Sequence, residues 1–526
     1  MAMDVRHSGA ESSGIRLSEL IGALSMAIDL GMGQPLEYGL ASCVLAMRLG
    51  EAAGFSSADL RAAYFLSLLR YVGCNAGTYE MAALFGDELE LRAEFAQIDP
   101  GQASQVMRLS LRYLREANAG ASPLRLAQVF INEFLSLPRI MREQFTGHCE
   151  VAQRLAERMG LDDSIILALG QLYERWDGKG MPHGLKGEAV APTVRLVTLA
   201  QDAVIFHRMG GSEAAVTMAR QRSGGAYDPA LVALFCAHAE TLLADLDGDT
   251  PWQEVIELEP GPRHTLIEAE LDAACQAIAD FVDIKSPFLL GHSSGVAELA
   301  AAAAARGDLP ANDQTLVRRA GWLHDLGQVG VSAGIWGKSE PLSERDWEAV
   351  RLHAYQAERV LARPGALAAV GAVAGRHHER QDGSGYHRGV PGSQLSPTAR
   401  ILAAADVYHA LAEPRPHRPA YSADQAADML GNEARNGRLD SDTVAWVLGA
   451  AGQPFSRTKA TLPSGLTERE AEVLRLVARG RTVPQVADQL VVSRKTADNH
   501  VQHIYGKIGV STRAGATLFA MEHALL

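Results

Sequence analysis

The chain contains 526 residues, of which 47% are hydrophobic and 21% charged, a composition typical of soluble globular proteins and a length that predicts roughly three or four domains. No stretch approaches the ~20 strongly apolar residues of a membrane-spanning helix, the N-terminus lacks a signal-peptide pattern, and five scattered cysteines exclude a disulfide framework, so we expect a cytoplasmic protein without a membrane partner. The net charge of −13 disfavours nucleic acid as a partner of the whole surface, although residues 463–526 carry eight basic side chains against six acidic ones.

Long segments rich in Ala, Leu, Arg and Glu, with few alternating β-branched residues, predict an almost entirely helical chain. Two segments rich in Gly, Pro and polar residues, 247–264 and 451–464, predict linkers. We therefore expect a first domain over residues 1–246, a second over 265–450 and a small third domain over 465–526.

The first two domains are related by an internal repeat. The sequence "YERWDGKGMPHGLKGEAVAPTVRL" (173–196) matches "HERQDGSGYHRGVPGSQLSPTARI" (378–401), and further upstream "LLRYVGC" matches "WLHDLGQ" (322–328). The offset changes between the two matches, so the first copy carries about 49 additional residues between Cys74 and His148. A repeat of this length indicates a duplicated domain rather than a solenoid of short units.

The second copy contains an ordered set of metal-ligand residue types that the first copy has largely lost. At five of these positions the first copy has Tyr38, Arg70, Tyr71, Leu172 and Tyr173, and it keeps a ligand-type residue only at His148. We predict that the first copy binds no metal, is not catalytic, and serves as a dimerisation surface or a sensor. The candidate ligands of the second copy are His292, His324, Asp325, His353, His377, His378 and Asp406.

Neutral imidazoles, together with a carboxylate able to bridge, suit a pair of divalent transition-metal ions. Two such ions ~3.5–4 Å apart hold a bridging hydroxide and stabilise the oxygens of an attacked phosphoryl group. The adjacent His377 and His378 fit this interpretation, because neighbouring side chains on a helix point about 100° apart and do not pack on one face.

The pattern H…HDLG…H…HHERQDGSGYH…D resembles the HD-GYP branch of the HD phosphohydrolase superfamily over roughly residues 265–450. Members of this branch are helical bundles that hydrolyse cyclic di-GMP with two or three iron or manganese ions. The resemblance implies that the candidate residues are the ligands of two divalent transition-metal ions and that Asp325 bridges them. It also implies a substrate-binding turn at Gly383, Gly385 and Tyr386. After the last aspartate, it implies contacts of Arg415 and Arg418 with the substrate phosphates.

Three positions depart from the pattern of this branch. Gln328 replaces the phosphate-facing lysine of the HDxGK motif, His387 replaces the proline of GYP, and Phe288 stands where three-metal members carry a glutamate. We expect Asp325 and Gln328 to act at the catalytic centre, with reduced substrate affinity or turnover because of these replacements.

The third domain begins with strong helix signals. Thr467 and Glu470 form a capping-box pattern, Gly480 ends the first helix, and Ser493 caps a later helix that opens with Arg, Lys and Thr. Two helices joined by a tight turn form a helix-turn-helix, and the segment resembles the LuxR-type DNA-binding domain. In that family the helix after Ser493 enters the major groove. The implied DNA contacts are Arg494, Lys495, Thr496 and Asn499 to bases or phosphates, and Arg481 and Lys507 to the phosphate backbone.

The predicted fold is therefore all-α: two tandem HD-type helical bundles followed by a small helix-turn-helix domain. Two functions of different class follow. In one, a metal-dependent phosphodiesterase is coupled to transcription through double-stranded DNA. In the other, the second domain only binds a cyclic dinucleotide, and the protein is a ligand-responsive transcription factor. A general nucleotide phosphohydrolase is a variant of the first. We expect a homodimer on two half-sites in either case.

Overall fold

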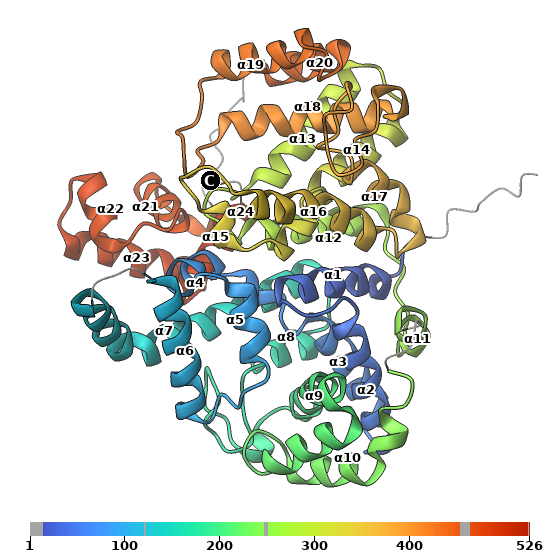
Figure 1. Ribbon diagram of the computed structural model, residues 1–526, viewed down its shortest axis with the longest axis vertical. Coiled ribbons are helices and arrows are strands. Elements are labelled where there is room, and N and C mark those ends of the chain that lie inside the picture. The colour runs from blue at the N-terminus through green and yellow to red at the C-terminus, as the bar shows by residue number, and fades with distance from the viewer. Residues whose placement is uncertain (1–13, 120–122, 247–250, 453–462, 524) are drawn as a thin grey trace, which may run out of the picture.

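The computed structural model describes residues 14–119, 123–246, 251–452, 463–523 and 525–526. Within these ranges it contains 24 α-helices and six short 3-10 helices and no β-strand, as predicted for an all-α chain. Two helical domains lie one above the other, and a small third domain extends to the side of their boundary (Figure 1). Among the helices of the described ranges, none is both long and apolar enough to cross a membrane.

The first domain is built around helices α1, α2, α3, α7 and α9. Three helices, α4 to α6, occupy the interval where the sequence predicts additional residues. The bounds are α1 Leu17–Gly31, α2 Tyr38–Ala52, α3 Ser57–Leu69, η1 Val72–Asn75, α4 Thr78–Phe85, α5 Glu88–Phe95, α6 Ala103–Ala117, α7 Pro123–Arg158, α8 Asp163–Leu169, η2 Gly187–Ala189, α9 Pro192–Gln221 and α10 Pro229–Leu242.

The second domain repeats this order without the three inserted helices. Helices α12, α13, α14, α16 and α18 correspond to α1, α2, α3, α7 and α9. The bounds are α12 Glu268–Asp283, α13 His292–Arg306, α14 Ala311–Leu323, η3 Leu326–Gly330, α15 Ala333–Trp336, α16 Glu344–Leu361, η4 Gly365–Leu367, α17 Ala368–Ala374, η5 Gly392–Gln394, α18 Pro397–Ala412, α19 Ala423–Arg435 and α20 Ser441–Ala451.

Equivalent helices in the two copies begin at equivalent signals. Proline stands at the first position of both α9 and α18, where its fixed φ angle already suits a helix. The Asp29 carboxylate accepts a hydrogen bond from the Gly39 amide at 3.0 Å at the start of α2, and Asp283 accepts one from the Ser293 amide at 2.9 Å at the start of α13. Carboxylates at these helix N-termini satisfy amides that lack a partner within the helix.

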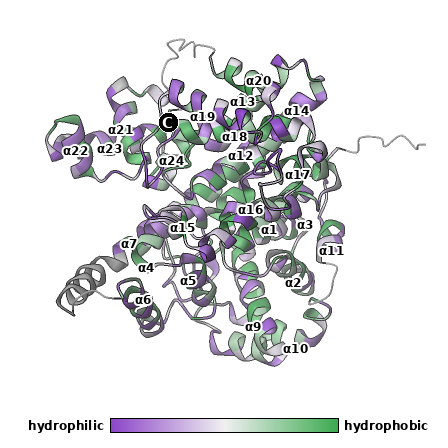
Figure 2. Ribbon diagram, turned by 45° about the horizontal axis from the view of Figure 1, so that its top comes forward, coloured by the Kyte–Doolittle hydropathy of each residue, from purple (hydrophilic) through white to green (hydrophobic). Residues whose placement is uncertain are grey.

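The two helical domains share one hydrophobic core. Buried residues of α1 to α3 and of α12 to α14 belong to a single cluster, and hydrophobic residues gather along these inner helices (Figure 2). The contacts between the domains are reciprocal, because α1 packs on η3 and α16 while α12 packs on η1 and α7. The duplicated domains therefore pair with each other inside one chain.

The segment expected to be a linker at 247–264 contains a packed helix, α11 (Pro251–Leu258), which lies against α2 and α1. Val255 is fully buried, and its carbonyl accepts a hydrogen bond from the Tyr64 hydroxyl at 3.0 Å. The Gly and Pro residues around this helix gave the segment its linker-like composition. Most of the second predicted linker, 451–464, lies outside the described residues.

The third domain contains η6 Pro463–Gly465, α21 Glu468–Ala478, α22 Val483–Leu490, α23 Arg494–Ile508 and α24 Arg513–Glu522. The Thr467 hydroxyl accepts a hydrogen bond from the Glu470 amide, and the Glu470 carboxylate accepts one from the Thr467 amide, which is the predicted capping box. Ser493 caps α23 in the predicted position. Helix α24 packs on α7 of the first domain and on α12 of the second.

Candidate metal centre and DNA-binding surface

All seven candidate ligands converge in the second domain from different helices. His292 is the first residue of α13, His324 and Asp325 follow α14, His353 lies in α16, and Asp406 lies in α18. His377 and His378 lie in the turn that follows α17. All except His378 are buried. Within the described residues, the four groups whose side chains could hold a metal ion lie in this domain and include all seven residues.

The seven residues form two adjoining groups with Asp325 between them. Asp325 Oδ1 lies 3.5 Å from both His353 Nε2 and His377 Nε2, and His378 belongs to the same group. Asp325 Oδ2 lies on the other side, 3.3 Å from His324 Nε2 and 3.8 Å from His292 Nε2.

Asp406 completes the second group. Its Oδ1 lies 3.3 Å from His292 Nε2, and its Oδ2 faces His378 Nδ1 at 3.8 Å. The two carboxylate oxygens of Asp325 thus point to different sets of imidazoles, which is the arrangement of a bridging ligand.

Backbone carbonyls fix the orientation of three of the imidazoles. The Nδ1 atoms of His324, His353 and His377 lie 2.7, 2.5 and 2.6 Å from the carbonyl oxygens of Gly321, Val350 and Ala374. An Nδ1–H that donates to a carbonyl leaves Nε2 as the unprotonated nitrogen available for a metal. The same relation recurs because each histidine lies three residues after the carbonyl that it contacts.

Unsatisfied buried atoms and proton affinities both fit a metal at this site. His324 Nε2 and Asp325 Oδ1 are buried and have no hydrogen-bond partner in the part of the chain that the structure describes. Burial lowers the pKa of His353 to about 4, so its imidazole is neutral at neutral pH. Burial opposes ionisation of Asp325, but the surrounding imidazoles, first His324, hold the pKa of its carboxyl well below the usual range. Burial opposes protonation of His292 and His324, but Glu413 and Asp325 raise the pKa of these two imidazoles, so a divalent metal ion that binds them would displace their protons.

Two residues near this centre were missed by the sequence analysis. Glu413 Oε2 accepts a hydrogen bond from His292 Nδ1 at 2.9 Å, and Glu413 Oε1 lies 3.2 Å from His409 Nδ1. Both belong to the stretch "DVYHALAE", in which His409 follows Asp406 by one helical turn. The spacing was visible in the sequence, but the contact of Glu413 with His292 depends on the packing of α18 against α13.

The predicted substrate turn lies beside the histidines. Gly383 has a φ of +75°, which favours glycine. A Cβ atom on Gly385 would lie 2.5 Å from the Arg380 nitrogen, so only glycine fits there. The Tyr386 ring lies 4.6 Å from the His378 ring between centroids. The Gln328 side chain is buried, and its Oε1 atom has no hydrogen-bond partner among the described residues.

The two candidate phosphate-binding arginines differ in their surroundings. Arg415 donates to Glu413 Oε2 at 3.0 Å and to the Phe288 carbonyl at 3.1 Å. Arg418 donates to four backbone carbonyls, those of Ala410 and Leu411 in the last turn of α18 and those of Glu413 and Pro419 in the loop that follows. Because the donors of Arg418 are engaged by the backbone, the contacts favour a role in holding the loop rather than the predicted phosphate contact. Arg415 lies beside the metal-ligand cluster through Glu413.

The corresponding positions of the first domain hold a different set of side chains. Tyr38 is buried and donates to the Gln201 carbonyl at 3.1 Å, and Arg70 is buried beside the Tyr71 ring. His148 Nε2 lies 3.1 Å from the Ala76 carbonyl oxygen, and burial lowers the pKa of His148 to about 3. His148 therefore has a structural contact that needs no metal.

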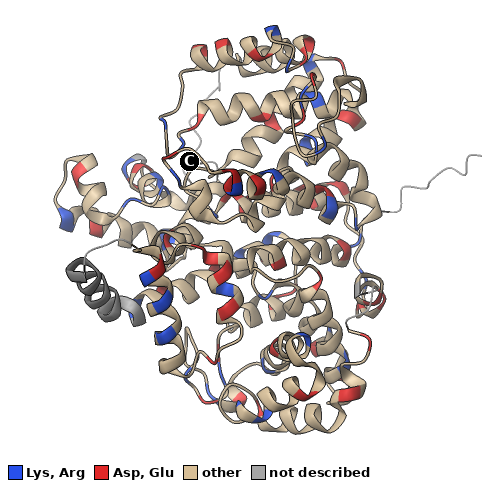
Figure 3. Cartoon of the chain, viewed as in Figure 1, with Lys and Arg blue, Asp and Glu red and all other residues tan. Residues whose placement is uncertain are grey.

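The predicted DNA-contacting residues of α23 lie on its exposed face. Arg494, Lys495, Thr496 and Asn499 are exposed, as is Arg481 in the loop before α22. Lys507 is instead bound within the domain, because its Nζ lies 2.7 Å from Glu470 Oε2 and 3.0 Å from the Gly465 carbonyl oxygen. Acidic and basic residues are interspersed over the helices that Figure 3 describes, and Arg494 and Lys495 are adjacent at the start of α23.

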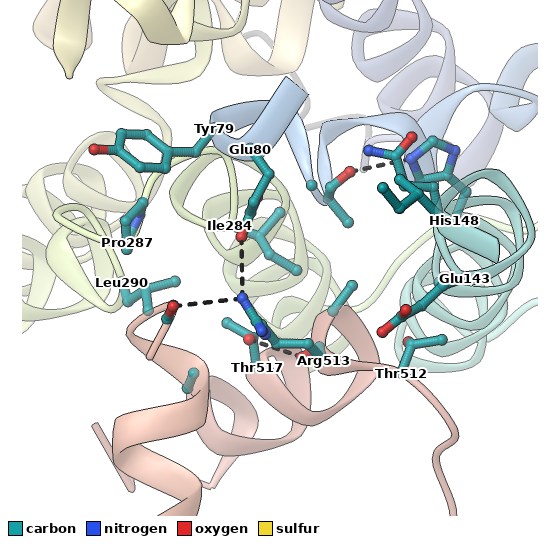
Figure 4. A pocket seen from close by; sticks show the side chains of 18 of the residues that line it. Tyr79, Glu80, Glu143, His148, Ile284, Pro287, Leu290, Thr512, Arg513 and Thr517 are labelled. Atoms are coloured by element: carbon teal, nitrogen blue, oxygen red, sulfur yellow. Dashed lines mark hydrogen bonds and ion pairs between the residues drawn. The ribbon is translucent and has the colours of Figure 1, made fainter. Parts of the chain in front are cut away.

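The third domain is docked where the two helical domains meet. Glu150 of α7 accepts hydrogen bonds from the Ser511 amide at 3.0 Å and from the Thr512 hydroxyl at 2.7 Å. Arg513 reaches Glu80 of α4 at 3.6 Å across a pocket of about 320 Å³ lined by all three domains (Figure 4). The start of α24 is thus held by the body of the protein.

A salt-bridge network fixes the other end of α24. Glu522 pairs with Arg154 at 2.9 Å and with Arg158 at 3.7 Å, and Arg158 also pairs with Asp280 of α12 at 2.5 Å. One arginine of the first domain therefore connects carboxylates of the second and third domains.

Comparison with known proteins follows the same division of the chain. Residues 137–231 and 276–443 match the family model described as HD domain, and residues 464–520 match Bacterial regulatory proteins, luxR family. The 3′3′-cGAMP-specific phosphodiesterase 3 of Vibrio cholerae is 31% identical over 418 residues, which cover 79% of this chain and 90% of that relative. The chain belongs to the HD-domain family. HD domains are metal-dependent phosphohydrolases, and the predicted resemblance is confirmed.

Two further similarities support this membership in the HD-domain family and the luxR-type assignment. The crystal structure of the cyclic GMP-AMP specific phosphodiesterase V-cGAP3 of V. cholerae covers 84% of this chain and 98% of its own, with a TM-score of 0.58 and 25% identity. The probable transcriptional regulatory protein NarL of Mycobacterium tuberculosis is 42% identical over 78 residues, 15% of this chain and 36% of that relative. The fold is thus a pair of HD-type helical domains followed by a luxR-type domain.

Proposed function

We propose that this HD-domain protein hydrolyses a 3′,3′-cyclic dinucleotide at a two-metal centre in its second domain, and that its luxR-type domain makes it a transcriptional regulator of the cytoplasm. The observation that carries the proposal is the position of Asp325, whose two oxygens face different groups of histidines. His353, His377 and His378 would hold one ion, and His292, His324 and Asp406 the other. The names of the V. cholerae relatives support a cyclic dinucleotide as substrate.

When bound, two divalent ions such as iron or manganese supply Lewis-acid activation of water and of the attacked phosphoryl group. The side chains of the chain hold the geometry for that chemistry. Carbonyl contacts at Nδ1 keep the imidazole Nε2 atoms directed at the centre. Gly383 and Gly385 let the backbone turn approach the phosphodiester, and Arg415 supplies a positive charge beside the cluster.

Metal analysis and hydrolysis assays of the purified full chain test this proposal. We expect two transition-metal ions per chain and turnover of 3′3′-cGAMP or cyclic di-GMP. Asp325→Asn should abolish turnover and reduce the metal content, because an amide does not bridge two cations as a carboxylate does. Asp424→Asn, at an exposed position of the same domain, is the matched control and should change neither. Full turnover in Asp325→Asn would reject the assigned mechanism.

The burial of Gln328 favours a second candidate function, binding of the nucleotide without turnover. A neutral amide stands where a lysine would attract the substrate phosphates, and its side chain is enclosed. Titration of the metal-loaded protein with 3′3′-cGAMP separates the two functions. Saturable binding with no product after prolonged incubation would establish the sensor and exclude the enzyme.

The exposed face of α23 supports DNA binding, and we propose that a homodimer binds two half-sites. Footprinting with the full chain should show protection that is lost in Arg494→Ala and kept in Arg435→Ala, an exposed arginine of the second domain. A complex with a single chain on DNA, measured by light scattering, would contradict the homodimer. Fractionation of cells tests the cytoplasmic location.

A further inference from the structure

The first domain contains a cavity at the place that corresponds to the metal centre of the second. The cavity has a volume of about 250 Å³ and is bounded by η1, the inserted helices α4 to α6, α7 and α9. Arg70, Tyr71, His148, Leu172 and Tyr173, which replace or match the metal ligands of the second domain, all line it. The loss of the ligands has therefore left a cavity with a different lining.

The walls of this cavity are mainly apolar. The inserted helices contribute Met81, Phe85, Leu91 and Phe95, and α7 contributes Phe145. Cavities that bind small organic molecules combine such walls with a few polar groups that fix orientation. The inserted helices thus enclose an apolar space.

The charged groups of the cavity favour an anion. Five basic residues line it against two acidic ones. Arg175 is paired with Asp99 and Asp177, and Arg222 is paired with Asp202.

Arg70 differs from these paired arginines, because it is buried and its Nε atom has no hydrogen-bond partner among the described residues. The buried Nε–H of Arg70 would gain a charge-assisted hydrogen bond from a carboxylate ligand.

We propose that this cavity binds a small carboxylate with an apolar body, its carboxylate on Arg70 and its body against α4, α5 and α7. A medium-chain fatty acid such as octanoate, or a substituted benzoate, combines one carboxylate with an apolar body of this kind.

Helix α5, which lines the cavity, also contacts the second domain, so a bound ligand can influence the metal centre through this helix. Glu88, the first residue of α5, is fully buried and accepts hydrogen bonds from the Ser332 hydroxyl at 2.6 Å and the Ala333 amide at 2.8 Å. Lys285 of the second domain lies 3.6 Å from the same carboxylate. Ser332 and Ala333 follow η3, which begins immediately after Asp325. A ligand that orders α5 therefore stabilises the segment that carries the bridging carboxylate.

Calorimetric titration of the full chain with octanoate, and with octanamide as the uncharged equivalent, tests the site. We expect saturable binding of octanoate and at least tenfold weaker binding of octanamide. Arg70→Met should weaken octanoate binding at least tenfold, whereas Arg108→Met, at an exposed position of α6, should leave it unchanged. Ser110→Phe should also remove binding by filling the cavity, and it keeps the test decisive if Arg70→Met does not fold.

Absence of saturable octanoate binding to the wild-type chain, or undiminished binding to both Arg70→Met and Ser110→Phe, would overturn the proposal. Hydrogen exchange tests the coupling between the ligand site and the second domain. Octanoate should slow exchange of the Ala333 amide, and unchanged exchange at saturating octanoate would overturn the coupling. None of these measurements depends on hydrolysis, so they remain decisive even if the phosphodiesterase proposal fails.

Discussion

The substitution Gly327→Ala should remove the metal from the second domain. Gly327 lies in η3, two residues after Asp325, and packs against the backbone of α16 at His353. A Cβ atom at this position would lie 2.8 Å from the carbonyl carbon of His353 and 3.0 Å from the Ala357 nitrogen, and still closer to the His353 carbonyl oxygen. Carbon atoms in contact are normally separated by ~3.5–4.0 Å, so η3 and α16 must move apart by about 1 Å.

A displacement of this size exceeds what a metal site tolerates, because ligand distances vary by only about 0.2 Å. Both sides of the contact carry ligands, since Asp325 precedes η3 and His353 lies in α16. Movement of either element therefore separates the bridging carboxylate from its imidazoles. We also expect a loss of about 1–3 kcal/mol in the free energy of unfolding, the usual cost of overpacking.

The first domain offers a matched control. A Cβ atom on Gly73, the equivalent of Gly327, would lie 2.6 Å from the carbonyl carbon of His148. Gly73→Ala should thus cause similar overpacking away from the metal centre. Elemental analysis and thermal unfolding of both variants provide the measurement. Full metal content in Gly327→Ala, or equal metal loss in both variants, would refute the reasoning.

The remaining predictions concern the contacts between domains and the DNA-binding surface. Glu88→Ala should lower the free energy of unfolding by about 3–5 kcal/mol in urea denaturation, because it leaves Lys285 buried without its carboxylate partner; a loss below that of an exposed Glu→Ala change would contradict this. Burial raises the pKa of Asp280 to about 6, against about 3.9 in the unfolded chain, so its stabilising effect is complete below pH ~4 and is lost as the pH rises to about 6. Asp280→Asn should remove this pH dependence. The free energy of unfolding of the wild type should therefore fall by up to about 3 kcal/mol more than that of the variant between pH ~4 and ~6. Lys507→Met should lower the melting temperature and leave the salt dependence of DNA affinity unchanged, since its amine is paired within the domain, whereas a flattened salt dependence would restore the predicted phosphate contact.

Features that depend on local pattern could be predicted from the amino-acid sequence. Helical composition, the internal repeat and the helix signals at Thr467 and Ser493 predicted the fold class and the third domain. The contrast between His324–Asp325 and Arg70–Tyr71 was enough to assign the metal centre to the second copy. The fold class and the luxR-type domain could be predicted because helix formation and motif spacing depend on residues close together in the chain, whereas the metal centre of the second copy stays a prediction.

How the domains meet, and which polar groups keep unused donors, becomes clear only from contacts in the folded structure. The reciprocal pairing of the two copies, the packed α11 and the docking of α24 depend on contacts between distant segments. The engagement of Arg418 by carbonyls and of Lys507 by Glu470 likewise removed donors that the sequence left available. Whether a charged side chain meets solvent, a carbonyl or an enclosed cavity depends on packing between distant helices, because composition fixes which groups exist but not which of them become neighbours.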